Sequence, residues 1–138
     1  SHIIEEMEER SGAREEEQES IVLRFHLDKK TKNKYVEQAI AFIGEHYREN
    51  ITISTVAEYL EISEGYLSRV FKKETNYTFT SYLTYYRMQV AMKLLKDCRI
   101  KIYEAAEQAG YSDTAYFSVQ FKKIVGISPS EYQDRSRQ

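Results

Sequence analysis

A segment that occurs twice is the feature of this sequence that most constrains its fold. Residues 53–63 (ISTVAEYLEIS) match residues 102–112 (IYEAAEQAGYS), and residues 66–73 (YLSRVFKK) match residues 116–123 (YFSVQFKK), about 50 residues further along the chain. The segments that follow, 76–82 and 126–132, also match. Two copies are too few for a stacked repeat array. The sequence therefore predicts a pair of equivalent units.

Each copy has the residues that a helix-turn-helix requires. Ala57 and Ala106 stand where the first helix of such a unit must approach the second closely. Gly110 falls in the predicted turn of the second copy, where a positive φ favours glycine. In the first copy Glu61 occupies this place, so the turn signal there is weaker.

Apolar spacing predicts the other helices. Residues at intervals of three and four predict a helix from Tyr35 to Asn50 and a long helix along residues 79–95, roughly 25 Å at 1.5 Å per residue. Side-chain caps are expected at Ser54 or Thr55, at Ser63, and at Ser128, where Pro129 and Glu131 complete a capping box.

The predicted fold class is all-α, with two helix-turn-helix subdomains joined by a long linker helix, about seven helices in total. The first unit is expected over about 34–78, the linker helix over about 79–97 and the second unit over about 98–134. Residues 1–33 are interpreted as an acidic linker or tail from a larger sensor protein, and a frayed charged tail is the alternative.

Charge is unevenly distributed along the chain. The net charge of −2 conceals a head, residues 1–20, with eight Glu against Arg10 and Arg14, followed by a body with a basic excess of +4. This excess alone does not indicate DNA binding. The positions of the basic residues must decide the function.

The second helix of each unit, about 64–75 and about 113–125, is the predicted recognition helix that enters a major groove. Its exposed N-terminal half would face base edges, and the candidates are Glu64, Gly65, Ser68 and Arg69 in the first copy and Asp113, Thr114, Ala115, Ser118 and Val119 in the second. Arg69 is the best candidate for direct readout, because a guanidinium can bond O6 and N7 of guanine together. Lysine pairs at equivalent repeat positions would neutralise phosphates, namely Lys72, Lys73, Lys122 and Lys123.

These residues complete a family resemblance over about 34–134, some three-quarters of the chain. The sequence resembles the DNA-binding domain of AraC/XylS transcription regulators in three segments. The first is residues 63–75 (SEGYLSRVFKKET), and the second, along the predicted linker helix, is Tyr82, Arg87, Ala91, Leu94 and Leu95. The third is in the second copy and consists of Ala106, Gly110, residues 116–118, residues 121–123, Gly126, Ser128, Pro129 and Tyr132. The resemblance implies two recognition helices in successive major grooves on one face of DNA, and contacts with RNA polymerase. It also implies an N-terminal sensor or receiver domain in the full-length protein.

Three positions depart from the family pattern. Asn76 stands where glycine is usual, and asparagine tolerates left-handed φ next best. Val119 replaces an arginine and Gln120 an apolar residue. Val119 could touch only a thymine methyl group, so less base reading is expected from the second helix.

Several conspicuous residues also have structural interpretations. Helical spacing favours the core for the recognition-helix aromatics Tyr66, Phe71, Tyr116, Phe117 and Phe121. Arg87 is expected to meet either phosphate or an internal carboxylate such as Glu58 or Glu107. Cys98 is expected to be a small, buried or half-buried residue, and His46 a surface or interface residue.

The leading interpretation is sequence-specific double-stranded DNA binding as the output domain of a transcription regulator. The alternative is an all-helical protein-interaction module without specific DNA binding. An enzyme is disfavoured because no nucleophile–base pair, phosphate loop or metal cluster is visible, and no cofactor is implied. The absence of a long apolar run or signal peptide favours a cytoplasmic protein without membrane contact.

Overall fold

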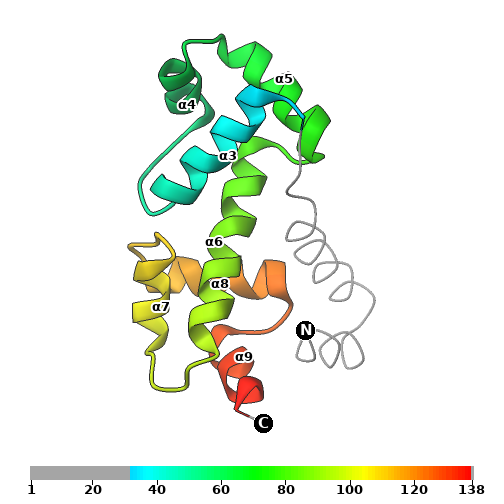
Figure 1. Ribbon diagram of the computed structural model, residues 1–138. Helices are drawn as coiled ribbons and strands as arrows, with labels where there is room; N and C mark the ends of the chain where they lie inside the picture. Colours follow the sequence, from blue (N-terminus) through cyan, green and yellow to red (C-terminus); the bar gives the residue numbers. More distant parts are fainter. Residues whose placement is uncertain (1–31, 138) are drawn as a thin grey trace.

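A computed structural model describes residues 32–137, and every regular element in that range is a helix (Figure 1). The helices are α3 (Lys34–His46), α4 (Ile53–Leu60), α5 (Glu64–Thr75), α6 (Phe79–Leu95), α7 (Ile102–Gln108), α8 (Thr114–Val125) and α9 (Pro129–Ser136). The all-α prediction of two helix-turn-helix units joined by a long helix is confirmed. The predicted acidic tail, except residues 32 and 33, lies outside the described residues.

The first unit consists of α3, α4 and α5, which pack around one hydrophobic core with the N-terminal half of α6. The helices contribute side chains at intervals of three and four, as an amphipathic helix does when one face is buried. The fully buried members include Val36, Ala39, Ile43, Val56, Leu67 and Phe71.

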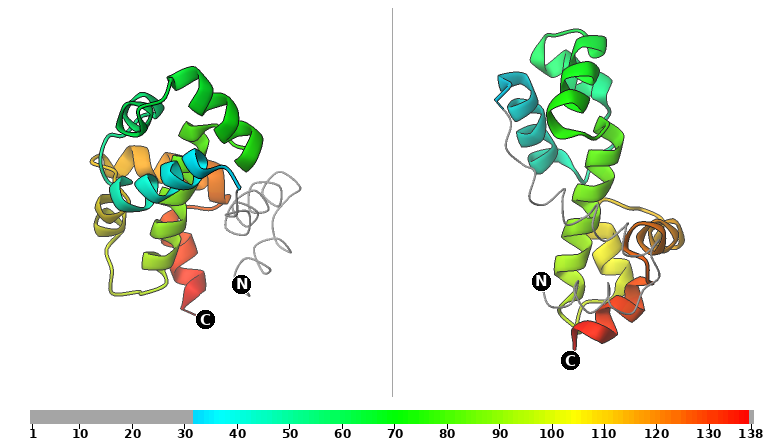
Figure 2. Two further views of the ribbon diagram at one scale, coloured as in Figure 1. Left: turned by 45° about the horizontal axis from the view of Figure 1, so that its top comes forward. Right: turned by 90° about the vertical axis from the view of Figure 1, so that its right-hand side faces the viewer.

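The second unit consists of α7, α8 and α9, which pack around a separate core with the C-terminal half of α6. Its fully buried residues include Ala105, Ala106, Ala109, Phe117 and Phe121. Figure 2, in its right-hand view, shows the first unit at one end of α6 and the second at the other.

The helix α6 belongs to both cores. Its first turns contribute Phe79, Tyr82 and Leu83 to the first core, and its last turns contribute Met88, Ala91, Met92 and Leu95 to the second. Met88, Ala91 and Leu95 repeat the spacing of the buried residues Val36, Ala39 and Ile43 of α3. The C-terminal half of α6 therefore takes the place in the second unit that α3 has in the first.

Arg87, in the middle of α6, holds the two units together. Its Nε donates to the carbonyl oxygen of Tyr47 at 2.7 Å, and its Nη2 donates to that of Glu49 at 2.9 Å. The guanidinium carbon lies 5.5 Å from the centroid of the Tyr111 ring. These contacts take the place of the predicted pairing with Glu58 or Glu107, and a contact of Arg87 with phosphate stays a prediction. The carbonyl oxygen of Tyr47, the C-cap of α3, has no partner within the helix, and the guanidinium donates to it.

The end of α3 also differs from the prediction. The helix ends at His46 rather than continuing to Asn50, because Tyr47 and Glu49 turn their carbonyl oxygens toward α6. His46 is half-buried, and its Nδ1 lies 2.7 Å from a carboxylate oxygen of Glu49.

The helix caps are partly those predicted. Ser63 accepts from the backbone N–H of Tyr66, as predicted, but α4 begins one residue before Ser54, and its cap is Thr52. Ser128 caps α9, while the carboxylate of Glu131 pairs with Arg135 at 2.9 Å instead of completing a capping box. Local sequence contains several hydroxyls near each helix start, and tertiary packing selects among them.

Both helix-turn-helix turns use the left-handed conformation. Glu61 has φ 59° and Gly110 has φ 99°, so the two residues that the repeat aligns have the same role. Asn76 and Gly126 match in the same way after α5 and α8. The first copy thus forms the turn without glycine, at a cost of about 1–2 kcal/mol for a left-handed residue.

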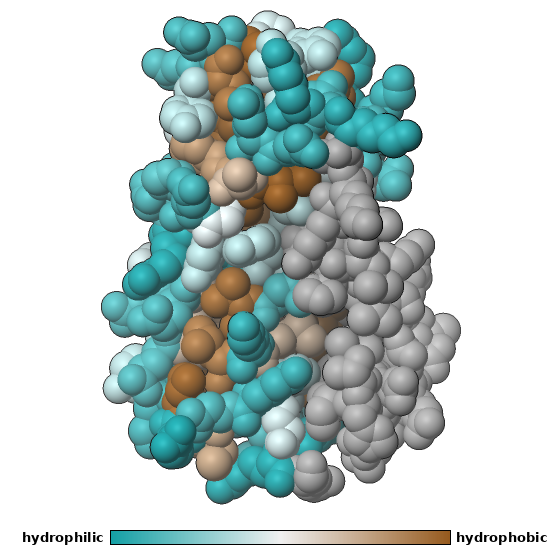
Figure 3. Space-filling view, in the orientation of Figure 1, coloured by the Kyte–Doolittle hydropathy of each residue, from teal (hydrophilic) through white to brown (hydrophobic). Residues whose placement is uncertain are grey.

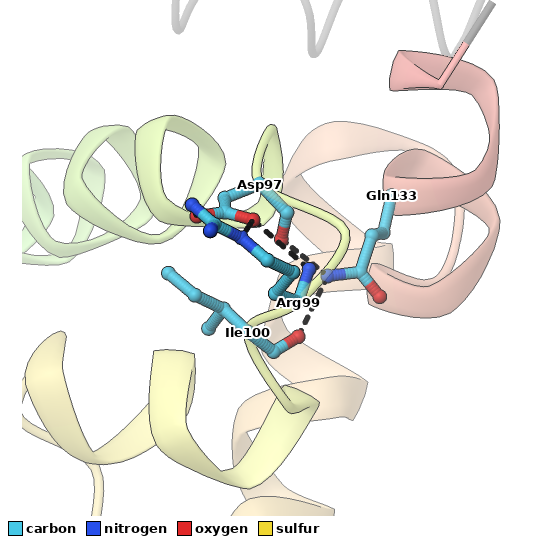
Figure 4. A network of polar contacts seen from close by, with 4 residues as sticks. All are labelled: Asp97, Arg99, Ile100 and Gln133. Carbon is cyan, nitrogen blue, oxygen red and sulfur yellow. Dashed lines mark hydrogen bonds and ion pairs between the residues drawn. The ribbon is translucent and has the colours of Figure 1, made fainter.

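The connection from α6 to α7 is attached to the last helix. The side-chain amide of Gln133 donates to the carbonyl oxygens of Asp97 at 3.0 Å and Ile100 at 2.7 Å (Figure 4). Arg99 pairs with the Asp97 carboxylate at the surface, and this contact lowers the pKa of Asp97. Cys98, in the same turn, is exposed and not half-buried as predicted, because α6 and its core contacts end at Leu95.

Within residues 32–137, no helix is both long and apolar enough to cross a membrane.

Candidate nucleic-acid interface

The recognition helix α5 buries one face and leaves the other in solvent. Leu67, Phe71 and Thr75 lie in the first core at intervals of four. The four predicted base-reading residues of this helix are all exposed, namely Glu64, Gly65, Ser68 and Arg69. A Cβ added to Gly65 would meet nothing within 4 Å, so the surface there is open to close approach. Hydrophilic side chains cover the part of the molecule where α5 lies (Figure 3).

Arg69 is positioned by an aromatic residue and leaves its charge free. Its guanidinium carbon lies 5.8 Å from the centroid of the Tyr66 ring, and Tyr35 of α3 meets Tyr66 edge to face at 6.1 Å. Arg69 forms no ion pair with any residue in the described range. An exposed guanidinium without a protein partner retains its donors for an external acceptor.

The recognition helix α8 has a different surface. Ala115 and Val119 are exposed, whereas Thr114 and Ser118 are half-buried. Asp113 lies just before the helix and accepts from the backbone N–H of Tyr116 at 3.1 Å. Its carboxylate is therefore the N-cap of α8, and a contact of this exposed residue with bases stays a prediction.

Tyr116 is the main error among the predicted core aromatics. Phe71, Phe117 and Phe121 are fully buried, and Tyr66 is half-buried, but Tyr116 is 54% exposed. In the first unit Tyr35 covers Tyr66, and α6 carries Arg87 at the corresponding place in the second unit. Because Arg87 reaches toward α3, it does not cover Tyr116.

The four lysines occupy equivalent places at the ends of the two recognition helices. All four, Lys72, Lys73, Lys122 and Lys123, are exposed, and none forms an ion pair within the described part of the chain. The backbone N–H of Asn76 bonds the Lys72 carbonyl at 2.9 Å, and that of Gly126 bonds the Lys122 carbonyl at 2.9 Å. The two lysine pairs are therefore presented by the same local structure.

The residues that link the two units were missed by sequence reasoning. The acceptors of Arg87 within the domain are backbone carbonyls and not the expected carboxylates, and no side-chain pattern reveals backbone acceptors. A Cβ on Gly110 would lie 2.9 Å from the Tyr47 oxygen and 3.0 Å from Cα of Arg48. The glycine is thus required for the approach of the units as well as for the turn, and its place in the motif was the only available signal.

No group of three or more His, Cys, Asp or Glu side chains in residues 32–137 could hold a metal ion. The equivalent helices α5 and α8 instead expose the guanidinium of Arg69, hydroxyl groups, small apolar groups and paired ammonium groups. Two such units on one shared helix define the class of DNA-binding domain with a double helix-turn-helix.

Comparisons with known proteins agree with this class. A family model described as a helix-turn-helix domain matches residues 56–135, more than half of the chain. The transcriptional regulatory protein HptR of Staphylococcus aureus is 37% identical over 98 residues, which make up 71% of this chain and 38% of that protein. An uncharacterized response regulatory protein of Staphylococcus epidermidis is 36% identical over 103 residues, 75% of this chain and 41% of that protein.

Among solved structures, the C-terminal domain of AraT, a response regulator from Geobacillus stearothermophilus, is similar with a TM-score of 0.71 and 39% identity, covering 74% of this chain and 85% of that one. The chain belongs to the AraC family of helix-turn-helix transcription regulators and contains the DNA-binding domain typical of that family. It spans about two-fifths of the length of the curated relatives named above.

Proposed function

We propose that this domain binds a specific double-stranded DNA sequence and acts as the output domain of a longer transcription regulator. The observation that carries the proposal is the equivalence of α5 and α8. Both expose side chains in their first turns, end in an exposed lysine pair that forms no ion pair within residues 32–137, and pack against one continuous helix. A structural or packing role for the repeat would not require unpaired cations at both positions.

The proposed roles divide into base reading and phosphate contact. Base edges are read by Glu64, Gly65, Ser68 and Arg69 of α5 and by Thr114, Ala115, Ser118 and Val119 of α8. Phosphates are contacted by Lys72, Lys73, Lys122 and Lys123. Arg69 has the leading role, because its guanidinium is free and can bond the two acceptors of a guanine.

The geometry favours one chain on two successive major grooves. Adjacent major grooves on one DNA face lie about 34 Å apart. The 17 residues of α6 span roughly 25 Å, with α5 joined to its N-terminal end and α8 packed against its C-terminal half. Because the two recognition helices differ in sequence, the site should be asymmetric.

The whole protein is proposed to be larger than this chain. The curated relatives named above are a transcriptional regulatory protein and a response regulatory protein more than twice as long as the matched region. We therefore place a sensor or receiver domain before residue 34 and a contact with RNA polymerase on the DNA-bound domain. The domain itself has no catalytic role in this proposal, and it works in the cytoplasm, where the chromosome lies.

Selection of genomic fragments with the purified domain, followed by footprinting, tests the proposal. We expect one enriched sequence motif, protected over about two helical turns on one DNA face. A palindromic motif protected only by a dimer would contradict the arrangement on a single chain. Equal affinity for all fragments, with no dependence on salt, would support the alternative of a protein-interaction module.

A further inference from the structure

The surface of α8 carries a continuous apolar strip, which we define as Ala115, Tyr116 and Val119. Val119 is 63% exposed and Tyr116 is 54% exposed, and they are two of the four large apolar side chains that are exposed in the described range. Ala115 is exposed as well. Residues three and four apart are neighbours on a helix, so Val119 adjoins both Tyr116 and Ala115.

This strip lies at the base-reading positions of the second unit. The repeat aligns Ala115 with Gly65 and Val119 with Arg69. Among the polar residues there, Thr114 and Ser118 are half-buried, and the exposed Asp113 lies before the helix and caps it. The strip is therefore what α8 offers to a groove.

The major groove contains a single kind of apolar group, the C5 methyl of thymine, and small apolar side chains contact it. Covering an exposed valine with a methyl group removes apolar surface of both partners from water, which is favourable. We propose that the second unit reads its half-site through thymine methyl groups, with Val119 and Ala115 as the contacting residues. This inference rests on the proposed function and assigns the first unit to guanine and the second to thymine.

Deoxyuridine substitution tests the proposal, because it removes the methyl group and leaves every hydrogen-bonding atom of the base in place. Each thymine of the selected operator is replaced in turn, and binding of the domain is measured by fluorescence anisotropy. We expect at least one position in the second half-site to lose about three- to fivefold in affinity, the value of one buried methyl group. The same series is then measured with Val119→Ala and, as a matched control, with Arg69→Ala.

Contact between Val119 and the methyl group predicts that the loss at one position disappears in Val119→Ala and persists in Arg69→Ala. A second half-site without thymine overturns the proposal. Unchanged affinity for every deoxyuridine operator also overturns it and leaves the proposed function intact. That result is expected if the strip binds another protein and not DNA. Loss of all sequence preference by the wild-type domain would overturn both.

Discussion

Arg87 and Gly110 meet at the boundary between the two units, with Nε of Arg87 3.1 Å from the place that a Cβ on Gly110 would occupy. The same Nε donates to the Tyr47 carbonyl oxygen, which would lie 2.9 Å from that Cβ. Because Gly110 has no Cβ, the end of α3, the side chain of Arg87 on α6 and the turn of the second unit can pack closely together. The two units contact each other at this junction.

We expect Gly110→Ala to destabilise the fold strongly. A left-handed φ costs a non-glycine residue about 1–2 kcal/mol, and the contacts with Tyr47 and Arg48 involve backbone that cannot easily move. The matched control is Gly65→Ala, which meets open space within a helix and should gain up to about 1 kcal/mol. Urea unfolding of both variants is the measurement, and equal stability of the two would contradict the assigned junction.

Arg87→Met should loosen the spacing between the recognition helices. The variant keeps an apolar stem but loses both bonds to the end of α3, at a cost of about 1–3 kcal/mol. We expect wild type to discriminate sharply against operators with one base pair inserted between the half-sites, and the variant to discriminate less. Arg99→Met, which removes only a surface ion pair, is the control. Unaltered discrimination by Arg87→Met would show that the units are held by other contacts.

Arg69→Ala should cost about 1–3 kcal/mol in operator binding and relax base preference at one position of the first half-site. The proposed reason is that the guanidinium on α5, which forms no ion pair within the described residues, bonds a guanine edge. Affinities for the operator, for single-base variants and for random DNA are compared. If affinity for random DNA falls as far as affinity for the operator, then Arg69 contacts phosphate instead.

The lysine pairs should determine the salt dependence of binding. With about four to six ion contacts, the slope of log K against log salt is expected near −4 to −5 for wild type. Lys72→Ala and Lys122→Ala should each reduce its magnitude by about one, without a change in sequence preference. Lys93→Ala, an exposed lysine of α6, should leave the slope unchanged. If Lys93→Ala reduced the slope as much as Lys72→Ala does, the slope would depend only on the overall charge of the domain.

Alkaline pH should weaken the first core through Tyr82. Burial, with smaller contributions from Tyr86 and Tyr77, raises the pKa of Tyr82 from 10.0 to about 12. Below pH 10 the hydroxyl is protonated in both the folded and unfolded chain, so its contribution to stability is fully present. Between pH 10 and 12 the unfolded chain ionises first, and the free energy of unfolding falls by up to about 1.4 kcal/mol per pH unit.

Tyr82→Phe should therefore show a shallower loss of stability over this pH interval. Tyr103→Phe is the matched control, because Tyr103 is 60% exposed and should not alter the pH dependence. Chemical unfolding at several pH values between 9 and 12 provides the data. A loss as steep in Tyr82→Phe as in wild type would rule out this tyrosine as the cause.

Local features of the fold could be predicted from sequence because they depend on neighbouring residues. The repeat located both helix-turn-helix units, and helical spacing located the buried Phe71, Phe117 and Phe121. Periodicity does not report what a second element covers. It therefore treated Tyr66 and Tyr116 alike, although Tyr66 is half-buried beside Tyr35 of another helix and Tyr116 is largely exposed.

Contacts between the units could not be predicted from the sequence, for a different reason. Arg87 and its acceptors are about 40 residues apart, and backbone carbonyls have no residue identity to recognise. The predicted base-reading and phosphate residues, in contrast, follow from their place on one helix face. Their accessibility is visible in the structure, and their contacts with DNA remain predictions.

The sharing of α6 between two cores limits how this domain can be divided or exchanged. Only a cut between Leu83 and Met88 would leave the buried residues of α6 with their own cores, and that cut would break the helix beside Arg87, which bonds the end of α3. The two recognition helices keep their relative position only where α6 is inherited whole, so a hybrid regulator should take both units together. Operator preference can then evolve by surface substitutions on α5 and α8, while the spacing of the half-sites passes unchanged from one regulator to the next.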